Sequence, residues 1–73
     1  MLALWPVSAS EPTQHRDLDA LERARAGVVE PVLWIVPREL VGEALKKLRH
    51  GDDLEVADAP ASLLAHRRAR MAA

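Results

Sequence analysis

The sequence predicts a small single α+β domain over residues 1–73, with about three helices and one or two short strands. Three observations predict it. A dense apolar run at residues 32–36 lies between two prolines, a helical repeat of apolar residues follows it, and helix start and stop signals bound residues 18–26. The chain is near the lower size limit for one core, and it contains no cysteine that could form a disulfide or zinc–thiolate site.

The first half of the chain predicts an irregular segment and then a helix. Residues 1–16 contain two prolines and are expected to form an irregular N-terminal lead-in. Asp17 is a candidate N-cap and Gly27 a stop signal for a helix at residues 18–26. Leu18 and Leu21 would place an apolar stripe of this helix against a core.

The second half predicts a buried strand, a long helix and a shorter pair of elements. The β-branched residues of the run at 32–36 favour a buried strand, with Trp34 in the core. Pro37 suits the first position of a helix that would continue to residue 50. The packed stripe of this helix would consist of Leu40, Val41, Ala44, Leu45 and Leu48. Asp52 and Asp53 are then expected to be solvated acids of a turn. Residues 54–56 could form a short strand beside residues 32–36, and residues 60–73 a C-terminal basic helix or tail.

The residues that usually carry chemistry are scattered. No serine is in a glycine-rich elbow, no glycine-rich phosphate loop is present, and His15, His50 and His66 lie far apart in sequence. We therefore expect no enzyme activity, no cofactor and no metal site. No run approaches the roughly 20 apolar residues of a membrane span, and the apolar start lacks a basic signal region. The chain is expected to be soluble and cytoplasmic.

Charge is divided unevenly along the chain and indicates a binding protein. Residues 1–58 contain eleven acidic and seven basic residues, whereas residues 59–73 contain three arginines and no acidic residue. These arginines could complete a helix end and pair with nearby acids, or they could contact phosphate or an acidic partner. Glu39 and Glu43 are either solvated or bind a basic partner segment, and Trp5 either packs on the domain or anchors a partner. The candidate partner-binding residues are Trp5, Glu39, Glu43, Arg67, Arg68 and Arg70.

One local resemblance points to DNA binding. The run Ile35-Val36-Pro37-Arg38-Glu39-Leu40, followed by residues 48–56, resembles the swapped-hairpin antitoxin and transition-state-regulator family. The chain departs from that pattern in a longer expected helix, in the missing glycine before Pro37, and in the missing strand after Val56. The resemblance implies a dimeric DNA-binding antitoxin or repressor, which is the alternative function.

A second resemblance covers the whole chain. Its length, its composition and the segments 32–37 and 39–48 resemble the small RNA-polymerase-binding transcription regulators of lytic Xanthomonas phages. This resemblance implies binding to the N-terminus of the largest subunit and to the flap of the second-largest subunit of host RNA polymerase. The chain is expected to be a monomer. It further implies contact with RNA near the exit channel, inhibition of initiation by displacement of the sigma factor, and antitermination.

Overall fold

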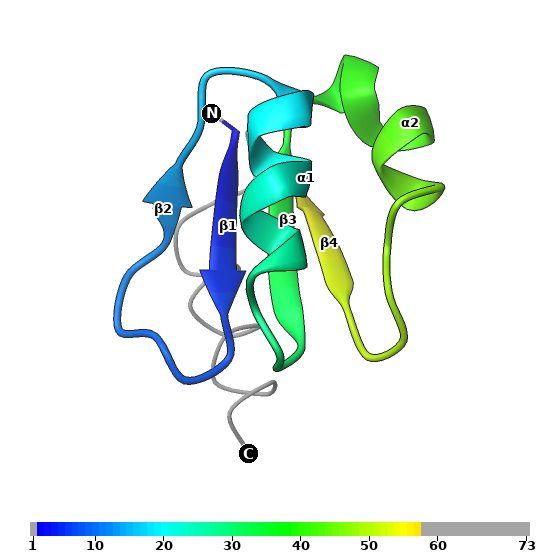
Figure 1. The fold of residues 1–73 in the computed structure, drawn as a ribbon. Helices are drawn as coiled ribbons and strands as arrows, with labels where there is room; N and C mark the ends of the chain where they lie inside the picture. Colours follow the sequence, from blue (N-terminus) through cyan, green and yellow to red (C-terminus); the bar gives the residue numbers. More distant parts are fainter. Residues whose placement is uncertain (1, 58–73) are drawn as a thin grey trace.

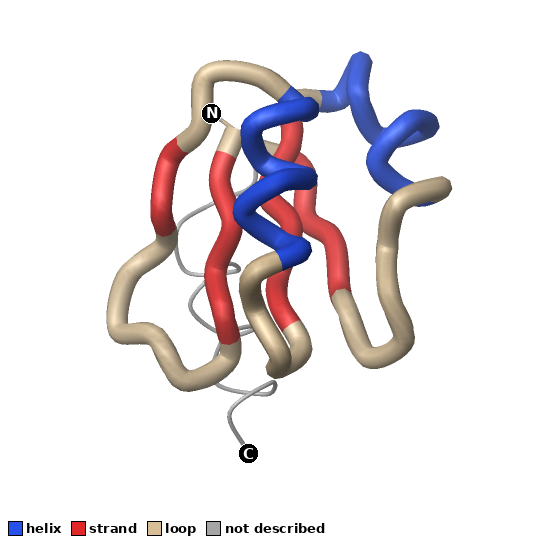
Figure 2. The backbone as a smooth tube through the Cα atoms, in the orientation of Figure 1, coloured by secondary structure: helices blue, strands red, loops and turns tan. Residues whose placement is uncertain are grey.

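The computed structural model describes residues 2–57, which form a four-stranded sheet with the helices packed on one face (Figures 1 and 2). The strand order is β2-β1-β3-β4; β1 is antiparallel to β2 and β3, and β4 is parallel to β3. In chain order the elements are β1 (Ala3–Pro6), β2 (Thr13–Gln14), α1 (Leu18–Ala26), β3 (Val32–Val36), the 3-10 turn η1 (Arg38–Leu40), α2 (Val41–Leu45) and β4 (Asp53–Val56).

The predicted count of elements is wrong for this part of the chain. The prediction was about three helices with one or two strands, whereas residues 2–57 contain two α-helices and four strands in a mixed α+β domain. The predicted C-terminal basic helix or tail at residues 60–73 lies outside the described residues. Most of the discrepancy arises in residues 2–16 and 37–50.

The helix predicted at residues 18–26 is confirmed at both ends. Asp17 has an extended backbone, and its carboxylate accepts a hydrogen bond of 2.8 Å from the N–H of Ala20, as an N-cap does. At the other end the N–H of Gly27 donates to the carbonyl of Ala24 at 3.1 Å. Leu18 and Leu21 are buried against the sheet, so the predicted apolar stripe is the packed face.

The buried strand predicted at residues 32–36 is confirmed as β3, and all five of its residues are buried. The strand lies between β1 and β4, and alternate side chains point to opposite faces of the sheet. Trp34 packs under the helices, while Leu33 and Ile35 belong to a separate cluster on the other face. Burial on both faces explains why this strand is a continuous apolar run rather than an alternating one.

The N-terminal segment was predicted to be irregular, but it contributes β1 and β2 to the sheet. Ala3 and Leu4 are almost completely buried, and β1 pairs with β3 along its whole length. Pro6 lies at the end of β1, a position in which its missing N–H is tolerated. The pairing to β3 is long-range in sequence, so the local proline and serine signals of this segment gave no indication of it.

The continuous helix predicted from Pro37 to residue 50 is also wrong. The chain forms η1 and the five-residue α2, and the N–H groups of Lys46 and Lys47 then donate to carbonyls three residues earlier, as in a tightening last turn. Residues 46–52 return along the sheet so that β4 can start beside the beginning of β3 (Figure 1). Gly51 has a φ of 90°, which favours glycine, and it lies against Pro31. The expected short strand at residues 54–56 is confirmed within β4.

The two faces of the sheet carry different apolar clusters. The helix-covered face holds the larger core, with partly buried residues of η1 and α2 at its margin. We call the opposite side the second face. Its buried members are Ala3, Leu33 and Ile35.

Candidate functional site

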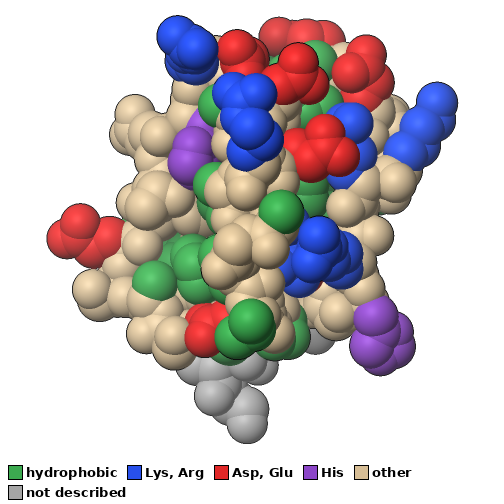
Figure 3. All heavy atoms as spheres, in the orientation of Figure 1, with side chains coloured by type: hydrophobic (Ala, Val, Ile, Leu, Met, Phe, Trp, Pro, Cys, Tyr) green, Lys and Arg blue, Asp and Glu red, His purple; other side chains and the backbone are tan. Residues whose placement is uncertain are grey.

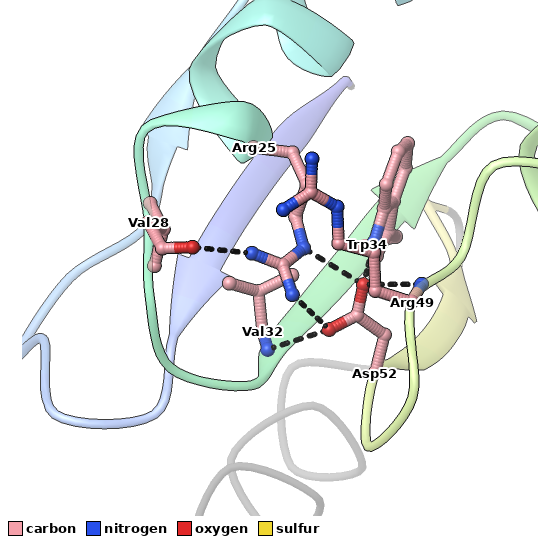
Figure 4. Close-up of polar contacts among 6 residues, drawn as sticks. All are labelled: Arg25, Val28, Val32, Trp34, Arg49 and Asp52. Atoms are coloured by element: carbon pink, nitrogen blue, oxygen red, sulfur yellow. Dashed lines mark hydrogen bonds and ion pairs between the residues drawn. The ribbon is translucent and has the colours of Figure 1, made fainter.

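A buried ion pair joins α1 to the turn before β4. Arg25 of α1 donates from Nε to Oδ2 of Asp52 at 2.8 Å and from Nη2 to Oδ1 at 2.9 Å, so the pair is bidentate. The side chains are 6% and 0% exposed, respectively. A third donor of the guanidinium, Nη1, reaches the carbonyl of Val28 at 2.8 Å (Figure 4).

Three more donors converge on the same carboxylate. The indole Nε1 of Trp34 donates to Oδ2 at 2.9 Å, and the backbone N–H groups of Arg49 and Val32 donate to Oδ2 at 3.0 Å and to Oδ1 at 3.2 Å (Figure 4). The carboxylate of Asp52 thus binds α1, β3 and the α2–β4 connection at once. Such a fully hydrogen-bonded buried charge fixes the relative position of these elements.

The surroundings of Asp52 favour its charged form. Burial by itself raises the pKa of this carboxyl group, but the hydrogen bonds from Arg25, from the Arg49 N–H, from Trp34 and from the Val32 N–H outweigh burial. The resulting pKa is lower than the ordinary value of 3.8. The prediction that Asp52 is a solvated turn acid is therefore wrong, because both of its carboxylate oxygens accept hydrogen bonds from groups of the protein and not from solvent.

This lowered pKa predicts a loss of stability in acid. The stabilisation is fully present above the unfolded-state pKa and is lost as the pH falls from about 4 through the folded-state pKa. We expect the free energy of unfolding, measured by urea denaturation between pH 7 and pH 2, to fall more steeply for the wild type than for Asp52→Asn. Parallel curves for the two proteins would contradict the lowered pKa.

The predicted partner-binding residues Glu39 and Glu43 lie together on the outer side of η1 and α2. Both side chains are exposed, as are those of Arg38 and Lys46 on the same segment. Leu45 is also 55% exposed there, although the sequence placed it on the packed stripe. A Cβ at Gly42 would meet no atom within 4 Å, so the surface is open at that position. We call this surface the α2 face; its residues are Arg38, Glu39, Gly42, Glu43, Leu45 and Lys46.

Trp5 lies away from the α2 face. It belongs to β1, pairs with Leu33 and packs against the cluster on the second face, half-buried. Its indole Nε1 donates to the carbonyl of Ala9 at 3.0 Å. The structure thus does not bring Trp5 together with Glu39 and Glu43. The remaining predicted site residues, Arg67, Arg68 and Arg70, lie outside the described residues.

The exposed helical side of the molecule carries charges of both signs. Acidic and basic side chains are both present on this side of the molecule (Figure 3). One close pair connects α1 to the turn after α2: Nζ of Lys47 lies 3.0 Å from Oε1 of Glu22. This pair is partly exposed and adds little stability. The surface over the helices therefore suits a partner with a mixed charge pattern and an apolar anchor.

Two apolar side chains are exposed that no sequence pattern indicated. Val29, in the loop between α1 and β3, is fully exposed, and Leu45 is the second large hydrophobic residue on the surface of the described chain. The Val29 loop is held by the neighbouring Glu30, whose carboxylate accepts hydrogen bonds from the N–H and the hydroxyl of Ser8. Of the two, Leu45 is the one on the same short helix as a predicted partner-binding residue, Glu43.

Residues 2–57 contain neither a metal-ligand cluster nor a membrane-spanning helix. In this range no group of three or more histidine, cysteine, aspartate or glutamate side chains could hold a metal ion. The Nε2 atom of His15 lies 3.0 Å from the hydroxyl oxygen of Thr13. No helix of the described chain is long and apolar enough to cross a membrane. Comparisons with protein-family models, with curated proteins and with solved structures found no match to this chain.

Proposed function

We propose that this chain binds host bacterial RNA polymerase near the RNA exit channel, in the host cytoplasm and as a monomer. It would inhibit promoter-dependent initiation by displacing the sigma factor, and it would promote antitermination. It would need no cofactor. The partner surfaces are the N-terminus of the largest subunit and the flap of the second-largest subunit. The whole-chain resemblance supplies the partner, and the α2 face supplies the binding surface.

One observation of the structure supports this surface above the others. Leu45 is 55% exposed on a helix of five residues, and the carboxylates of Glu39 and Glu43 are exposed on the same segment. Removal of an apolar side chain from water supplies affinity at the centre of an interface, whereas surrounding charges set the association rate and the register. The α2 face has both an exposed apolar side chain and exposed charged side chains.

The charge of the described domain supports a basic partner segment. Residues 2–57 contain ten acidic and seven basic residues, which gives a net charge of −3. Because Arg25 and Asp52 neutralise each other inside the domain, the surface carries the whole of this excess. A lysine- or arginine-rich polymerase segment would be attracted by this overall excess. On the α2 face, where Arg38 and Lys46 balance the two acids in number, it would pair individually with Glu39 and Glu43.

The alternative function receives less support from the geometry. The segment that resembles the swapped-hairpin family runs from β3 through η1 and α2 to β4. These two strands pair in parallel within one chain, whereas a hairpin is an antiparallel pair. The segment therefore offers no hairpin for exchange between two copies.

Charge reversal at Glu43 tests the proposal. We expect Glu43→Lys to weaken binding to purified host RNA polymerase about tenfold at low salt, because it places like charge against a basic segment. Terminator readthrough in a purified transcription reaction is expected to fall with binding. The measurements are fluorescence anisotropy of the labelled chain and the yield of full-length transcript.

Glu11→Lys is the matched control. Glu11 is exposed in the β1–β2 connection and its reversal changes the net charge by the same amount. Equal weakening by both variants would show that net charge, and not the α2 face, determines binding. Absence of binding between the wild-type chain and the polymerase at micromolar concentration would refute the proposed function itself.

A further inference from the structure

Gly42 is a helical glycine that the conformation of the described chain does not require. The two other glycines have a local reason: Gly27 ends α1, where its N–H donates to the carbonyl of Ala24, and Gly51 has a φ of 90°. Gly42 is the second residue of α2, its φ lies outside the left-handed region, and the helix continues to Leu45. It therefore occupies neither a left-handed turn nor a helix C-terminus, the positions in which glycine is common.

No close approach within the described chain explains Gly42 either. A Cβ at this position would meet no atom of residues 2–57 within 4 Å, whereas a Cβ at Gly51 would lie 3.3 Å from Cγ of Pro31. Glycine destabilises a helix relative to alanine, because it has more conformational freedom to lose on folding. Gly42 thus weakens α2 and leaves open space above it, without a benefit inside residues 2–57.

Gly42 lies between an apolar and an acidic side of the α2 face. A helix turns by about 100° per residue, so Leu45 lies about 60° from Gly42 on one side of the axis and Glu43 about 100° on the other. Glu39 lies about one turn before Glu43, on the same side. Leu45 is 55% exposed, and both glutamates are exposed. Because glycine has no side chain, the face is low at its centre, between an apolar side chain and two carboxylates.

We propose that a helical, lysine- or arginine-rich segment of the polymerase packs across Gly42, closer to α2 than a side chain at that position would permit. This inference rests on the proposed function, because it names the kind of segment that the α2 face binds. One side of the segment covers Leu45 with an apolar side chain, and the other side places basic groups against Glu39 and Glu43. Burial of Leu45 supplies affinity, and the charges set the register.

The main chain of η1 and α2 favours a helical partner over an extended one. An extended segment gains affinity by hydrogen bonding to the unpaired N–H and C=O groups of a strand edge. The main chain of this segment bonds to itself instead, as the N–H of Lys46 does to the carbonyl of Glu43 at 3.2 Å. A partner helix also satisfies its own main chain, and the distance between two packed helices depends on the size of the side chains at the contact. Glycine gives the closest packing.

Lys46 gives the α2 face a direction. It is exposed and lies one turn after Gly42, displaced by about 40° toward the acidic side. Arg38 lies about one turn before Gly42, displaced toward the apolar side. A basic group opposite Lys46 would be repelled, whereas one opposite Glu39 or Glu43 would be attracted. The segment is therefore expected to have its basic residues at the Glu39 end of the face and none at the Lys46 end.

Gly42→Ala tests the close approach in the full chain. We expect the urea midpoint of unfolding not to fall, since alanine is the better helix former and its methyl group meets no atom of residues 2–57. We expect the Kd for purified host RNA polymerase to rise about tenfold, because the methyl group occupies space that the partner helix fills. Gly42→Leu, with a larger side chain, is expected to raise the Kd further. Fluorescence anisotropy of the labelled chain measures it.

Gly27→Ala is the matched control. The φ of Gly27 is −87°, and a Cβ there would lie at an ordinary contact distance of 3.6 Å from the carbonyl oxygen of Ala24. The residue lies at the end of α1 farther from α2 (Figure 1). This variant is expected to bind the polymerase as the wild type does.

Photo-cross-linking tests whether the bound segment is helical. The chain has no cysteine, so Lys46→Cys provides a single attachment point for a benzophenone maleimide. We expect the cross-linked polymerase residues to lie in one basic segment and to recur at every third or fourth position, which is the period of a helix. Cross-links at every second position, the period of a strand, or outside a basic segment would overturn the helical partner.

The outcomes separate this inference from the proposed function. If the wild type binds the polymerase and Gly42→Ala binds equally well, or if Gly27→Ala is weakened to the same extent, the close approach at Gly42 is refuted and the proposed function stands. A lowered urea midpoint in Gly42→Ala would assign the glycine a structural role instead. A dimer of the chain alone in sedimentation velocity, dissociated by Gly42→Ala, would assign the α2 face to a second copy. Absence of binding by the wild type refutes the proposed function itself.

Discussion

Asp52→Ala is expected to lower the free energy of unfolding by about 3–5 kcal/mol, the range found when one partner of a buried ion pair is removed. The substitution leaves the buried guanidinium of Arg25 without its carboxylate. It also removes the acceptor of the Trp34 indole and of two backbone N–H groups. Unsatisfied buried donors each add to the cost. Urea denaturation followed by circular dichroism measures the change.

The effect is large in relation to the total stability of such a small domain. At about 0.05–0.15 kcal/mol per residue, a chain of 73 residues has roughly 4–11 kcal/mol of stability. Loss of 3–5 kcal/mol would thus leave Asp52→Ala partly unfolded near the lower end of this range. We expect the variant to have a strongly reduced urea midpoint.

Two control variants separate the causes. Glu11→Ala removes an exposed carboxylate and is expected to change the free energy of unfolding by less than about 0.5 kcal/mol. Arg25→Met combined with Asp52→Ala removes the orphaned charge and is expected to recover part of the loss, while the indole and backbone donors stay unsatisfied. An Asp52→Ala variant as stable as Glu11→Ala would show that the ion pair does not hold α1 to the sheet.

The parts of the fold that could be predicted are those specified by neighbouring residues. The cap at Asp17 and the stop at Gly27 bound α1, and both act through hydrogen bonds to residues three positions away. The apolar run between Pro31 and Pro37 specified β3 because burial on both faces leaves no polar position. Each of these signals is contained within ten residues of sequence.

The parts that could not be predicted depend on distant partners. β1 is a strand because it pairs with β3, nearly thirty residues away. Pro6 at its end argued against a strand when only neighbouring residues were considered. Asp52 was assigned to solvent because its partner Arg25 lies 27 residues earlier in the chain. The helical period after Pro37 correctly placed Leu40 and Ala44 against the core, yet it did not reveal that α2 ends at Leu45.

The candidate site shows the same division between local and distant signals. The exposure of Glu39 and Glu43 followed from the helical period, and the structure has both side chains exposed. The exposure of Leu45 contradicts that period, and it arises because residues 46–52 leave the helix to reach the start of β4. No pattern within the sequence indicates at which residue the chain must leave the helix and turn back toward β4.

Trp34→Ala is expected to lower the free energy of unfolding by about 3–5 kcal/mol through the cavity it leaves. The side chain is 0% exposed and is the largest fully buried one of the described residues. It also donates to the carboxylate of Asp52, so the substitution removes one of that group's five hydrogen bonds. Thermal and urea denaturation, followed by the fluorescence of the remaining Trp5, measure the change.

Trp34→Phe separates packing from hydrogen bonding. It keeps an aromatic ring in the core and removes the indole donor, and a hydrogen bond to a charged group is worth about 1.5–3 kcal/mol. We expect its loss to be smaller than that of Trp34→Ala, and we expect it to shrink in acid as the carboxylate of Asp52 is protonated.

Trp5 provides the matched tryptophan. It is half-buried on the second face and donates to a backbone carbonyl rather than to a charge. Trp5→Ala is therefore expected to cost less than Trp34→Ala, and Trp5→Phe is expected to cost the same at pH 7 and in acid. Equal losses for the two alanine variants would mean that Trp34 is not the centre of the core. A pH-independent loss in Trp34→Phe would mean that its indole does not stabilise the charge of Asp52.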